Sequence, residues 1–274
     1  MSFFQFKGKN VFYDVQGDGQ PVLLLNGIMM STLSWAAFVP VFKTNLQLIR
    51  FDFLDQGQSD KMANEPAYTQ ALQVELIAAL MAHLQLNTAD IVGISYGGEV
   101  ALQFAIAHPQ KVRRLVLFNT CAYTTPWLSD IGKAWNLAAS TGNGQAYYYT
   151  SIPMIYSPHF YEHRLEWMRK REQVLFPVFG NPTFTEAMVR LTNSAETHDV
   201  REKLSSIQCH TLVVSSDQDY ITPMTEQQKI VKALPHSHYV LIPETGHASM
   251  YERPALFTSL VLGFLLAPTH DYTI

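Results

Sequence analysis

The stretch Ile91-Val-Gly-Ile-Ser95-Tyr-Gly-Gly98 decides the fold that we expect for this chain. An apolar run leads into it, and a segment of helical length follows as far as His108-Pro109. Its core, Gly93-x-Ser95-x-Gly97, is typical of a sharp turn that places a serine between a strand and a helix. Residues two positions before and after such a serine must be small, because the turn brings their backbones together. The alternative is an ordinary turn in which the serine only caps the helix.

Similar apolar runs recur along the chain on both sides of this stretch. They lie at residues 22–25, 46–51, 89–92, 114–118, 210–214 and 238–242. Helix-length segments lie between most of them, at residues 33–43, 68–86, 96–107 and 223–234, and a last one follows at 254–266. Near-continuous apolar strands that alternate with helices indicate a parallel sheet buried on both faces.

Two further features complete the expected core. The β-rich runs at 3–6 and 11–15 predict an antiparallel hairpin at one edge of the sheet. Thr222 and Pro223 are the expected N-cap and first residue of the helix at 223–234. We therefore expect an α/β fold with a mostly parallel eight-stranded sheet and helices on both faces.

The segment 123–205 interrupts the alternation of strands and helices. It is too long for a structureless loop and holds much of the chain's aromatic content, so we predict an inserted helical cap. The core domain would then comprise residues 1–122 and 206–274. Most cap aromatics are expected to pack against one another. We expect Trp127 and Tyr148 to reach the mouth of a site, where apolar walls suit an acyl chain.

Composition disfavours several classes of protein. The chain has 274 residues, of which 47% are hydrophobic, which is enough for a sizeable core. Its net charge of −4 provides no positive field for a phosphate backbone, so we expect no nucleic-acid partner. Cys121 and Cys209 lie far apart, which favours neither a disulfide framework nor a metal site. Without a signal-peptide pattern, and with 255–267 too short to span a bilayer, we expect a cytoplasmic protein.

A serine hydroxyl is a weak nucleophile unless a base and an acid accompany it. In proteins with this type of serine turn, the acid and then the histidine follow along the chain. Asp217 and Asp219 follow the run at 210–214, and His247 follows the run at 238–242. Because the carboxyl ends of parallel strands meet at one edge, we expect an aspartate and His247 to lie near Ser95. The spacing alone leaves both aspartates open.

In these motifs and their order, the chain resembles the capped serine hydrolases of the α/β-hydrolase-fold superfamily over nearly its whole length. The acid loop of that family, Gly-x-x-Asp-x-x-x-Pro, is similar to Ser216-Asp-Gln-Asp219-Tyr-Ile-Thr-Pro223, with Ser216 in place of the glycine. The resemblance implies that Ser95 is the nucleophile, His247 the base and Asp219 the acid.

The resemblance extends to two more loops. The family's oxyanion loop, usually His-Gly-x, resembles Asn26-Gly27-Ile28, which implies that the backbone N–H groups of Ile28 and Tyr96 bind the oxyanion. Asn26 departs from the family histidine. The stretch Phe51-Asp52-Phe-Leu-Asp-Gln-Gly57-Gln-Ser59 resembles Asp-x-Arg-Gly-x-Gly-x-Ser, from which Leu54 and Asp55 depart. The sequence does not say what these departures do.

The resemblance implies hydrolysis of a carboxylic ester or thioester, with a small or apolar acyl group, in a small-molecule substrate. No cofactor and no metal are expected, and Met29 and Tyr96 are expected to line the pocket beside the chemistry. Around residues 23–31 and 51–59 the chain also resembles bacterial hydroxyacyl transferases of rhamnolipid-precursor synthesis, which keeps acyl transfer to a hydroxyacyl acceptor open. A receptor that binds its ligand without turnover is the alternative from another class.

Overall fold

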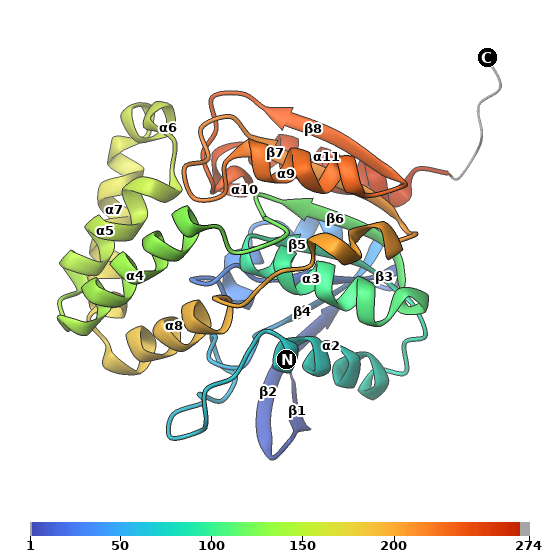
Figure 1. Ribbon diagram of the computed structural model, residues 1–274, viewed down its shortest axis with the longest axis horizontal. Coiled ribbons are helices and arrows are strands. Elements are labelled where there is room, and N and C mark those ends of the chain that lie inside the picture. The colour runs from blue at the N-terminus through green and yellow to red at the C-terminus, as the bar shows by residue number, and fades with distance from the viewer. Residues whose placement is uncertain (1, 269–274) are drawn as a thin grey trace.

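The computed structural model describes residues 2–268, and its strands form one sheet (Figure 1). The strands are β1 (Ser2–Phe6), β2 (Lys9–Gln16), β3 (Gln20–Leu25), β4 (Leu46–Phe51), β5 (Ala89–Ile94), β6 (Val112–Phe118), β7 (His210–Ser216) and β8 (Ser237–Ile242). Their order across the eight-stranded sheet is β1-β2-β4-β3-β5-β6-β7-β8. β1 and β2 are antiparallel to their neighbours and the other pairs are parallel. The predicted mostly parallel sheet is confirmed.

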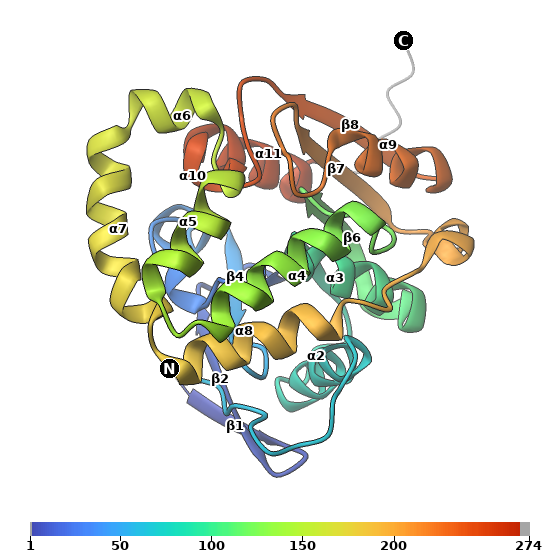
Figure 2. The ribbon, with the colours of Figure 1, turned by 60° about the vertical axis from the view of Figure 1, so that its left-hand side comes forward.

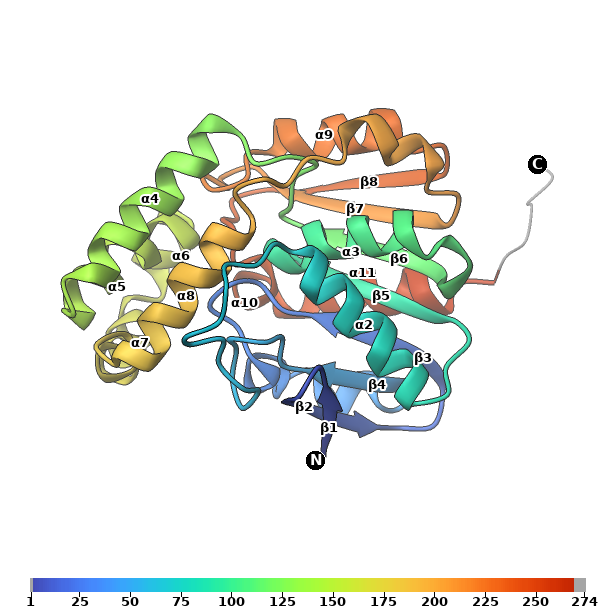
Figure 3. The same cartoon turned by 60° about the horizontal axis from the view of Figure 1, so that its bottom comes forward.

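Each buried strand contributes alternate side chains to two separate cores. In β3, Leu23 and Leu25 join one core, while Val22 and Leu24 join the other. The first core lies under α2 (Ala71–His83), α3 (Tyr96–Ala107) and α9 (Met224–Ala233). The second lies under η1 (Thr32–Trp35), α1 (Val39–Phe42), α10 (Ser249–Glu252) and α11 (Pro254–Leu266). Figure 3 shows the helices on the two faces of the sheet, so the strands are apolar on both sides, as their sequence predicts.

One expected helix is divided. The segment 33–43 forms η1 and, after a break at 36–38, the short helix α1. Pro40 explains the break, because its ring would collide with the carbonyl of Ala36 in a continuous helix and it has no N–H to donate. The structure instead uses Pro40 in the first turn of a new helix, where neither property matters.

Five α-helices between β6 and β7 lie beyond the carboxyl ends of the parallel strands (Figures 1 and 2). They are α4 (Pro126–Ser140), α5 (Gly144–Ile155), α6 (Pro158–His163), α7 (Leu165–Phe179) and α8 (Pro182–Ser194). We call residues 126–194 the helical insertion. Side chains of Thr125, Asn143, Ser157 and Asn181 cap the four helices α4, α5, α6 and α8. The boundaries 123–205 for a cap remain a prediction.

The segments that lead into and out of the helical insertion lie side by side. Tyr123 and Asp199 form an isolated antiparallel bridge. Beyond the insertion the chain forms η3 (Arg201–Ser206), and η2 (Pro109–Lys111) precedes β6. Within residues 2–268, no helix combines the length and apolar character that a membrane crossing requires.

Candidate active site

Ser95 stands on a turn that only glycine neighbours allow. It lies between the last residue of β5 and the first of α3, with a φ of 54° and a ψ of −123°. A Cβ on Gly93 would lie 2.6 Å from the carbonyl oxygen of Gly97. A Cβ on Gly97 would lie 2.3 Å from the carbonyl oxygen of Leu25. Neither glycine has a positive φ among the described residues, so close approach of the backbones requires them.

The backbone of Ser95 is held tightly, while its hydroxyl is not used to hold the turn. Its N–H donates to the Phe118 carbonyl at 3.0 Å, and its carbonyl accepts from the Thr120 hydroxyl at 2.9 Å. Ser95 occupies the N-cap position of α3, yet its side chain makes no capping hydrogen bond. The helix-capping alternative is therefore wrong. The hydroxyl faces a cavity whose lining also includes His247.

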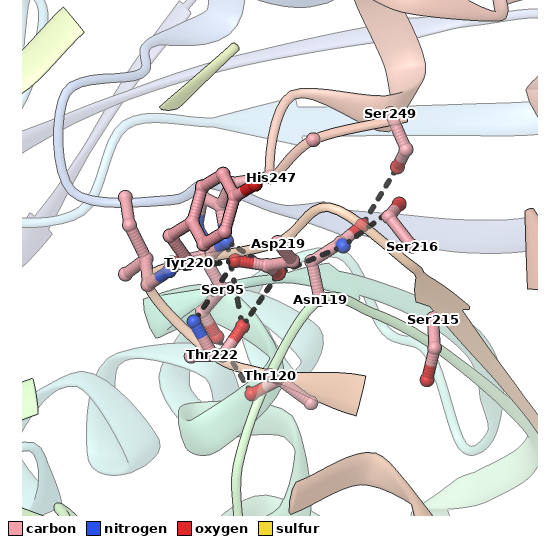
Figure 4. A network of polar contacts seen from close by, with 12 residues as sticks. Ser95, Asn119, Thr120, Ser215, Ser216, Asp219, Tyr220, Thr222, His247 and Ser249 are labelled. Carbon is pink, nitrogen blue, oxygen red and sulfur yellow. Dashed lines mark hydrogen bonds and ion pairs between the residues drawn. The ribbon is translucent and has the colours of Figure 1, made fainter. Parts of the chain in front are cut away.

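Asp219 lies at the centre of a dense network that includes His247 (Figure 4). Its Oδ2 accepts from His247 Nδ1, Asn119 Nδ2 and the Thr222 hydroxyl, each at 2.9 Å. Its Oδ1 accepts from the N–H groups of Ile221 and Thr222, also at 2.9 Å. Burial raises the pKa of Asp219, but the charge of His247 and these hydrogen bonds outweigh burial and hold the pKa below its usual range.

The role that the sequence predicts for Thr222, as the N-cap of the helix at 223–234, is wrong. Thr222 does not cap α9, whose N-cap is Pro223 and which has no side-chain cap. The Thr222 hydroxyl instead donates to Asp219. Asp217, the other aspartate that the spacing left open, is exposed and accepts from the Thr245 N–H at 3.2 Å. The structure therefore places Asp219, and not Asp217, against His247.

Asn119 is a site residue that the sequence reasoning missed. It follows β6 with a φ of 48° and is fully buried. Besides Asp219, its Nδ2 donates to the Ser216 hydroxyl at 3.1 Å, and its Oδ1 accepts from the Ser249 hydroxyl at 2.7 Å. A polar residue at the carboxyl end of a parallel strand was the available signal, since Ser95 and Asp219 follow strands in the same way.

Asn26 and Gln56 orient the loop after β3. Asn26 donates to the Phe51 carbonyl and to Gln56 Oε1, both at 3.0 Å, and accepts from the Trp35 indole at 2.7 Å. Gln56 Nε2 donates to the carbonyl of Gly27 at 2.8 Å. The C=O and N–H of a trans peptide point in opposite directions. Binding the Gly27 carbonyl therefore turns the Ile28 N–H away from Gln56.

Asp55, one of the departures from the family pattern, joins the core to the helical insertion. Its φ is 72°, and its buried carboxylate accepts from Arg190 Nε and Nη2 of α8, from the Tyr68 hydroxyl and from the Met62 N–H. The shortest Arg190 contact is 2.7 Å. Leu54, the other departure, is buried in the core. The Asp55 departure therefore ties this loop to the insertion, whereas Leu54 adds to the core.

The cavity beside Ser95 lies between the sheet edge and the helical insertion. It measures about 1180 Å³, open solvent at its mouth included. Met29 and Tyr96, two of the residues expected to line the pocket, do line it, and so does Ile28. The insertion contributes mainly apolar side chains, namely Leu128, Ile131, Trp135, Ile152, Ile155, Leu175 and Phe179.

Two of the predicted pocket residues lie elsewhere. Trp127 is 54% exposed, and its indole N–H donates to the Tyr220 carbonyl at the outer surface. Tyr148 is 0% exposed but packs inside the helical insertion against Phe176 and Phe179. Neither residue lines the cavity. Trp135, two turns after Trp127 on α4, lines it instead.

Comparisons with known proteins agree with this architecture. Residues 20–254 match the family described as alpha/beta hydrolase fold. A solved structure of MGS-M2, an alpha/beta hydrolase enzyme from a Medee basin deep-sea metagenome library, is 49% identical, has a TM-score of 0.97 and covers 100% of both chains.

More distant relatives also carry hydrolase names. RutD from Caulobacter sp. (strain K31), named as a carbamate hydrolase, is 26% identical over 264 residues, which cover 93% of this chain and 95% of RutD. The 2-hydroxymuconate semialdehyde hydrolase of Pseudomonas putida is 26% identical over 258 residues, which cover 91% of this chain and 88% of the relative. The chain therefore belongs to the alpha/beta hydrolase fold family and is an enzyme of the hydrolase class.

Proposed function

We propose that this hydrolase cleaves a carboxylic ester or thioester through an acyl-enzyme on Ser95. The Ser95 Oγ attacks the carbonyl carbon while His247 Nε2 takes its proton, and the resulting tetrahedral oxyanion collapses as the alcohol or thiol leaves with that proton. Water then attacks the acyl-enzyme with His247 again as base, which releases the acid. Asp219 orients the imidazole and stabilises its positive charge.

The contact between Asp219 Oδ2 and His247 Nδ1, at 2.9 Å, carries this proposal. A hydrogen bond from Nδ1 to a carboxylate fixes the tautomer in which Nε2 is the proton acceptor. His247 and Ser95 line the same cavity, and the Ser95 hydroxyl makes no capping hydrogen bond. Nε2 of His247 is therefore the atom that accepts the proton of this hydroxyl. An anionic Asp219, favoured by its lowered pKa, suits the stabilising role.

Two backbone amides are suited to bind the oxyanion. Neither the Ile28 N–H nor the Tyr96 N–H donates a hydrogen bond to any acceptor in the described part of the chain. Tyr96 is the first residue of α3, whose N-terminus carries a partial positive charge. Gln56 holds the Gly27 peptide in the orientation that frees the Ile28 N–H. Fixed amides at developing charge lower a barrier by about 3 kcal/mol each.

We propose that the helical insertion acts as a cap that selects the acyl group. Four of its helices, α4, α5, α7 and α8, line the cavity, and most of those side chains are apolar. Such walls favour an apolar acyl chain over a strongly hydrated one. Movement of these helices would admit the substrate.

A fluorophosphonate probe tests the proposed nucleophile. We expect one adduct per chain, located on Ser95 by peptide mass spectrometry. Ser95→Ala should lose both the adduct and the turnover of para-nitrophenyl butyrate, the latter by about 10³-fold or more. Ser215→Ala is the matched control, because the Ser215 hydroxyl donates to Gln227 at 3.0 Å and not to Asp219 or His247. Folded protein that labels at another residue would overturn the proposal.

The same assay separates the two alternatives. A receptor without turnover would bind esters yet release no para-nitrophenol. An acyl transferase would, on addition of a hydroxyacid acceptor, form a transfer product at the expense of the free acid. We expect free acid as the product in both conditions.

A further inference from the structure

Arg171 introduces a positive charge into a cavity that is otherwise mostly apolar. It belongs to α7 of the helical insertion and is the one Lys or Arg among the described residues that line the cavity beside Ser95. Apolar walls lower the local dielectric and so strengthen the interaction of this charge with an anion. A guanidinium in such a place needs a partner, whether from the protein or from a ligand.

Residues 2–268 supply no anionic partner for Arg171. Its Nε is buried and makes no hydrogen bond within the described residues, and no carboxylate lies within ion-pair distance of its guanidinium there. Glu172, the next residue, accepts instead from Arg169 and Tyr149. Glu252, a buried carboxylate on the core, accepts from Ser157 and Gly246. Both nearby acids are therefore committed to other donors.

Aromatic rings hold the guanidinium in position. Its central carbon lies 5.2 Å from the ring centres of Trp167 and Tyr251 and 6.0 Å from that of Tyr156. Trp167 and Tyr156 belong to the insertion, whereas Tyr251 belongs to α10 on the core, and its hydroxyl donates to the Ser34 carbonyl. Stacking on ring faces leaves the N–H groups in the guanidinium plane available to an acceptor.

The carboxylates that line the cavity are already bound by other groups. Glu99 accepts from Gln70 at 2.6 Å and from the Cys121 thiol at 3.3 Å, and Glu196 accepts from Ser129 at 2.5 Å. None of these partners is one of the aromatic residues that surround Arg171. An anionic substrate group would therefore be attracted to Arg171 and repelled from the side of the cavity that Glu99 and Glu196 line.

We infer that Arg171 binds a carboxylate of the substrate, so that the enzyme acts on esters or thioesters that carry a free carboxylate elsewhere in the molecule. The cleavage step in this inference rests on the proposed function, whereas the binding of a carboxylate by Arg171 does not. Arg171 would accept the carboxylate in its guanidinium plane while the apolar walls hold the hydrocarbon part. The substrate class is thus an acidic ester and not a simple fatty ester.

Four esters in two matched pairs test the inference. Para-nitrophenyl hydrogen glutarate carries the carboxylate on the acyl side and is compared with para-nitrophenyl methyl glutarate. Para-carboxyphenyl butyrate carries it on the alcohol side and is compared with its methyl ester. Arg171→Met should lower kcat/KM for the acidic member of at least one pair by about tenfold to a hundredfold. For the neutral member, the change should stay below about threefold.

Two further variants separate binding from structure. Arg171→Lys keeps the charge and should retain part of the preference for the acidic ester. Lys170→Met is the matched control on the same helix, because the Lys170 side chain is 73% exposed and already paired with Glu166. It should change neither ester. Equal losses for acidic and neutral esters in Arg171→Met would show that Arg171 only clamps α7 to Tyr251, and would overturn the inference.

A binding measurement keeps this result apart from the proposed reaction. Glutarate should raise the Tm of the wild type and of Ser95→Ala, and should not raise that of Arg171→Met, while dimethyl glutarate has no such selective effect. If glutarate binds through Arg171 but no ester is cleaved, the proposed reaction fails and the anion site stands. If esters are cleaved and glutarate stabilises all variants equally, or none, the anion site fails and the reaction stands.

Discussion

The sheet edge and the helical insertion form opposite walls of one cavity, and they are built in different ways. At the sheet edge, polar side chains such as Asp219 and Asn26 each bind several partners, so their orientation is fixed by hydrogen bonds. On the insertion, Trp135 and Phe179 present apolar surface, and even Arg171 is held by rings. Substitutions at the sheet edge should therefore abolish most of the activity, whereas substitutions on the insertion should change the activity by small steps.

The largest difference is expected within a single loop of the sheet edge. Asp219→Asn should lower kcat for ester hydrolysis by about 10⁴-fold, because the imidazole loses the acceptor that sets its tautomer. Asp217→Asn should change kcat less than about threefold, since among residues 2–268 the Asp217 carboxylate accepts only from the Thr245 N–H. Steady-state kinetics on both variants checks this. If Asp217→Asn lowered kcat more than Asp219→Asn, Asp217 would be the acid. The hydrogen bonds around Asp219 would then have no part in the reaction.

Asn119 tests whether hydrogen bonds around the acid matter as a group. Asn119→Ala removes one donor to Asp219 and leaves the Ser249 hydroxyl without its acceptor. We expect kcat to fall about thirtyfold with little change in KM, since a buried hydrogen bond to a charged group is worth about 2 kcal/mol. Ser215→Ala is the control, because the Ser215 hydroxyl donates to Gln227 and not to Asp219 or Asn119. An unchanged kcat would mean that the Thr222 hydroxyl and the two backbone donors are enough to hold Asp219.

Arg190 makes one of the polar contacts between the helical insertion and the core, through the Asp55 carboxylate. Arg190→Met should lower the free energy of unfolding by about 2 kcal/mol, less than for a fully buried pair, because its side chain is 23% exposed. Denaturant unfolding measures this loss. Arg201→Met, which breaks the exposed pair with Asp199, should cost less than about 0.5 kcal/mol. Similar small losses for both would show that Asp55 does not depend on the insertion.

Gln56 tests the orientation of the loop after β3 that we propose to bind the oxyanion. Gln56→Ala removes a side-chain donor to the Gly27 carbonyl, which keeps the Met30 N–H as a donor. It should lower kcat about fivefold to tenfold, since the loop also keeps its Asn26 contacts to Phe51 and Trp35. KM should stay near its original value, because the lost contact matters mainly in the transition state. A rise in KM at constant kcat would assign Gln56 to substrate binding.

The smallest effects are expected on the insertion wall. Trp135→Ala enlarges the cavity and should shift the preferred acyl length in a series of para-nitrophenyl esters, with changes of about fivefold or less in kcat/KM. Trp127→Ala should leave the preference unchanged, since Trp127 lies outside the cavity lining. If Trp127→Ala shifted the preference and Trp135→Ala did not, the insertion would have to rearrange when substrate binds.

The sequence predicted most of the sheet edge because that edge follows a local rule. Apolar runs mark the strands, and residues just after them meet at one edge, which brings Ser95, Asp219 and His247 together. The helix at 96–107 has the predicted bounds. The helix at 33–43 does not, since Pro40 breaks a pattern that its apolar spacing alone suggests.

The insertion wall could not be predicted in the same detail. Aromatic residues occur on all sides of its helices, so their number does not tell which of them face the cavity. Trp127 and Trp135 lie on the same helix, but Trp135 lines the cavity whereas Trp127 is exposed. The pairing of Asp55 with Arg190 spans 135 positions and leaves no local signal in the sequence. Such contacts depend on how the finished parts dock, which only the three-dimensional structure gives.

The bridge between the two ends of the insertion has a consequence for how such enzymes diversify. The Thr124 N–H donates to the His198 carbonyl at 2.9 Å, and the Val200 N–H donates to the Ala122 carbonyl at 2.8 Å, so the chain leaves and rejoins the sheet at one seam. The entropy of closing a loop grows only slowly with its length. An insertion with a different number of helices, or with different side chains toward the cavity, can therefore replace this one between the same two ends. Substrate selectivity can then evolve in the insertion while the sheet stays unchanged.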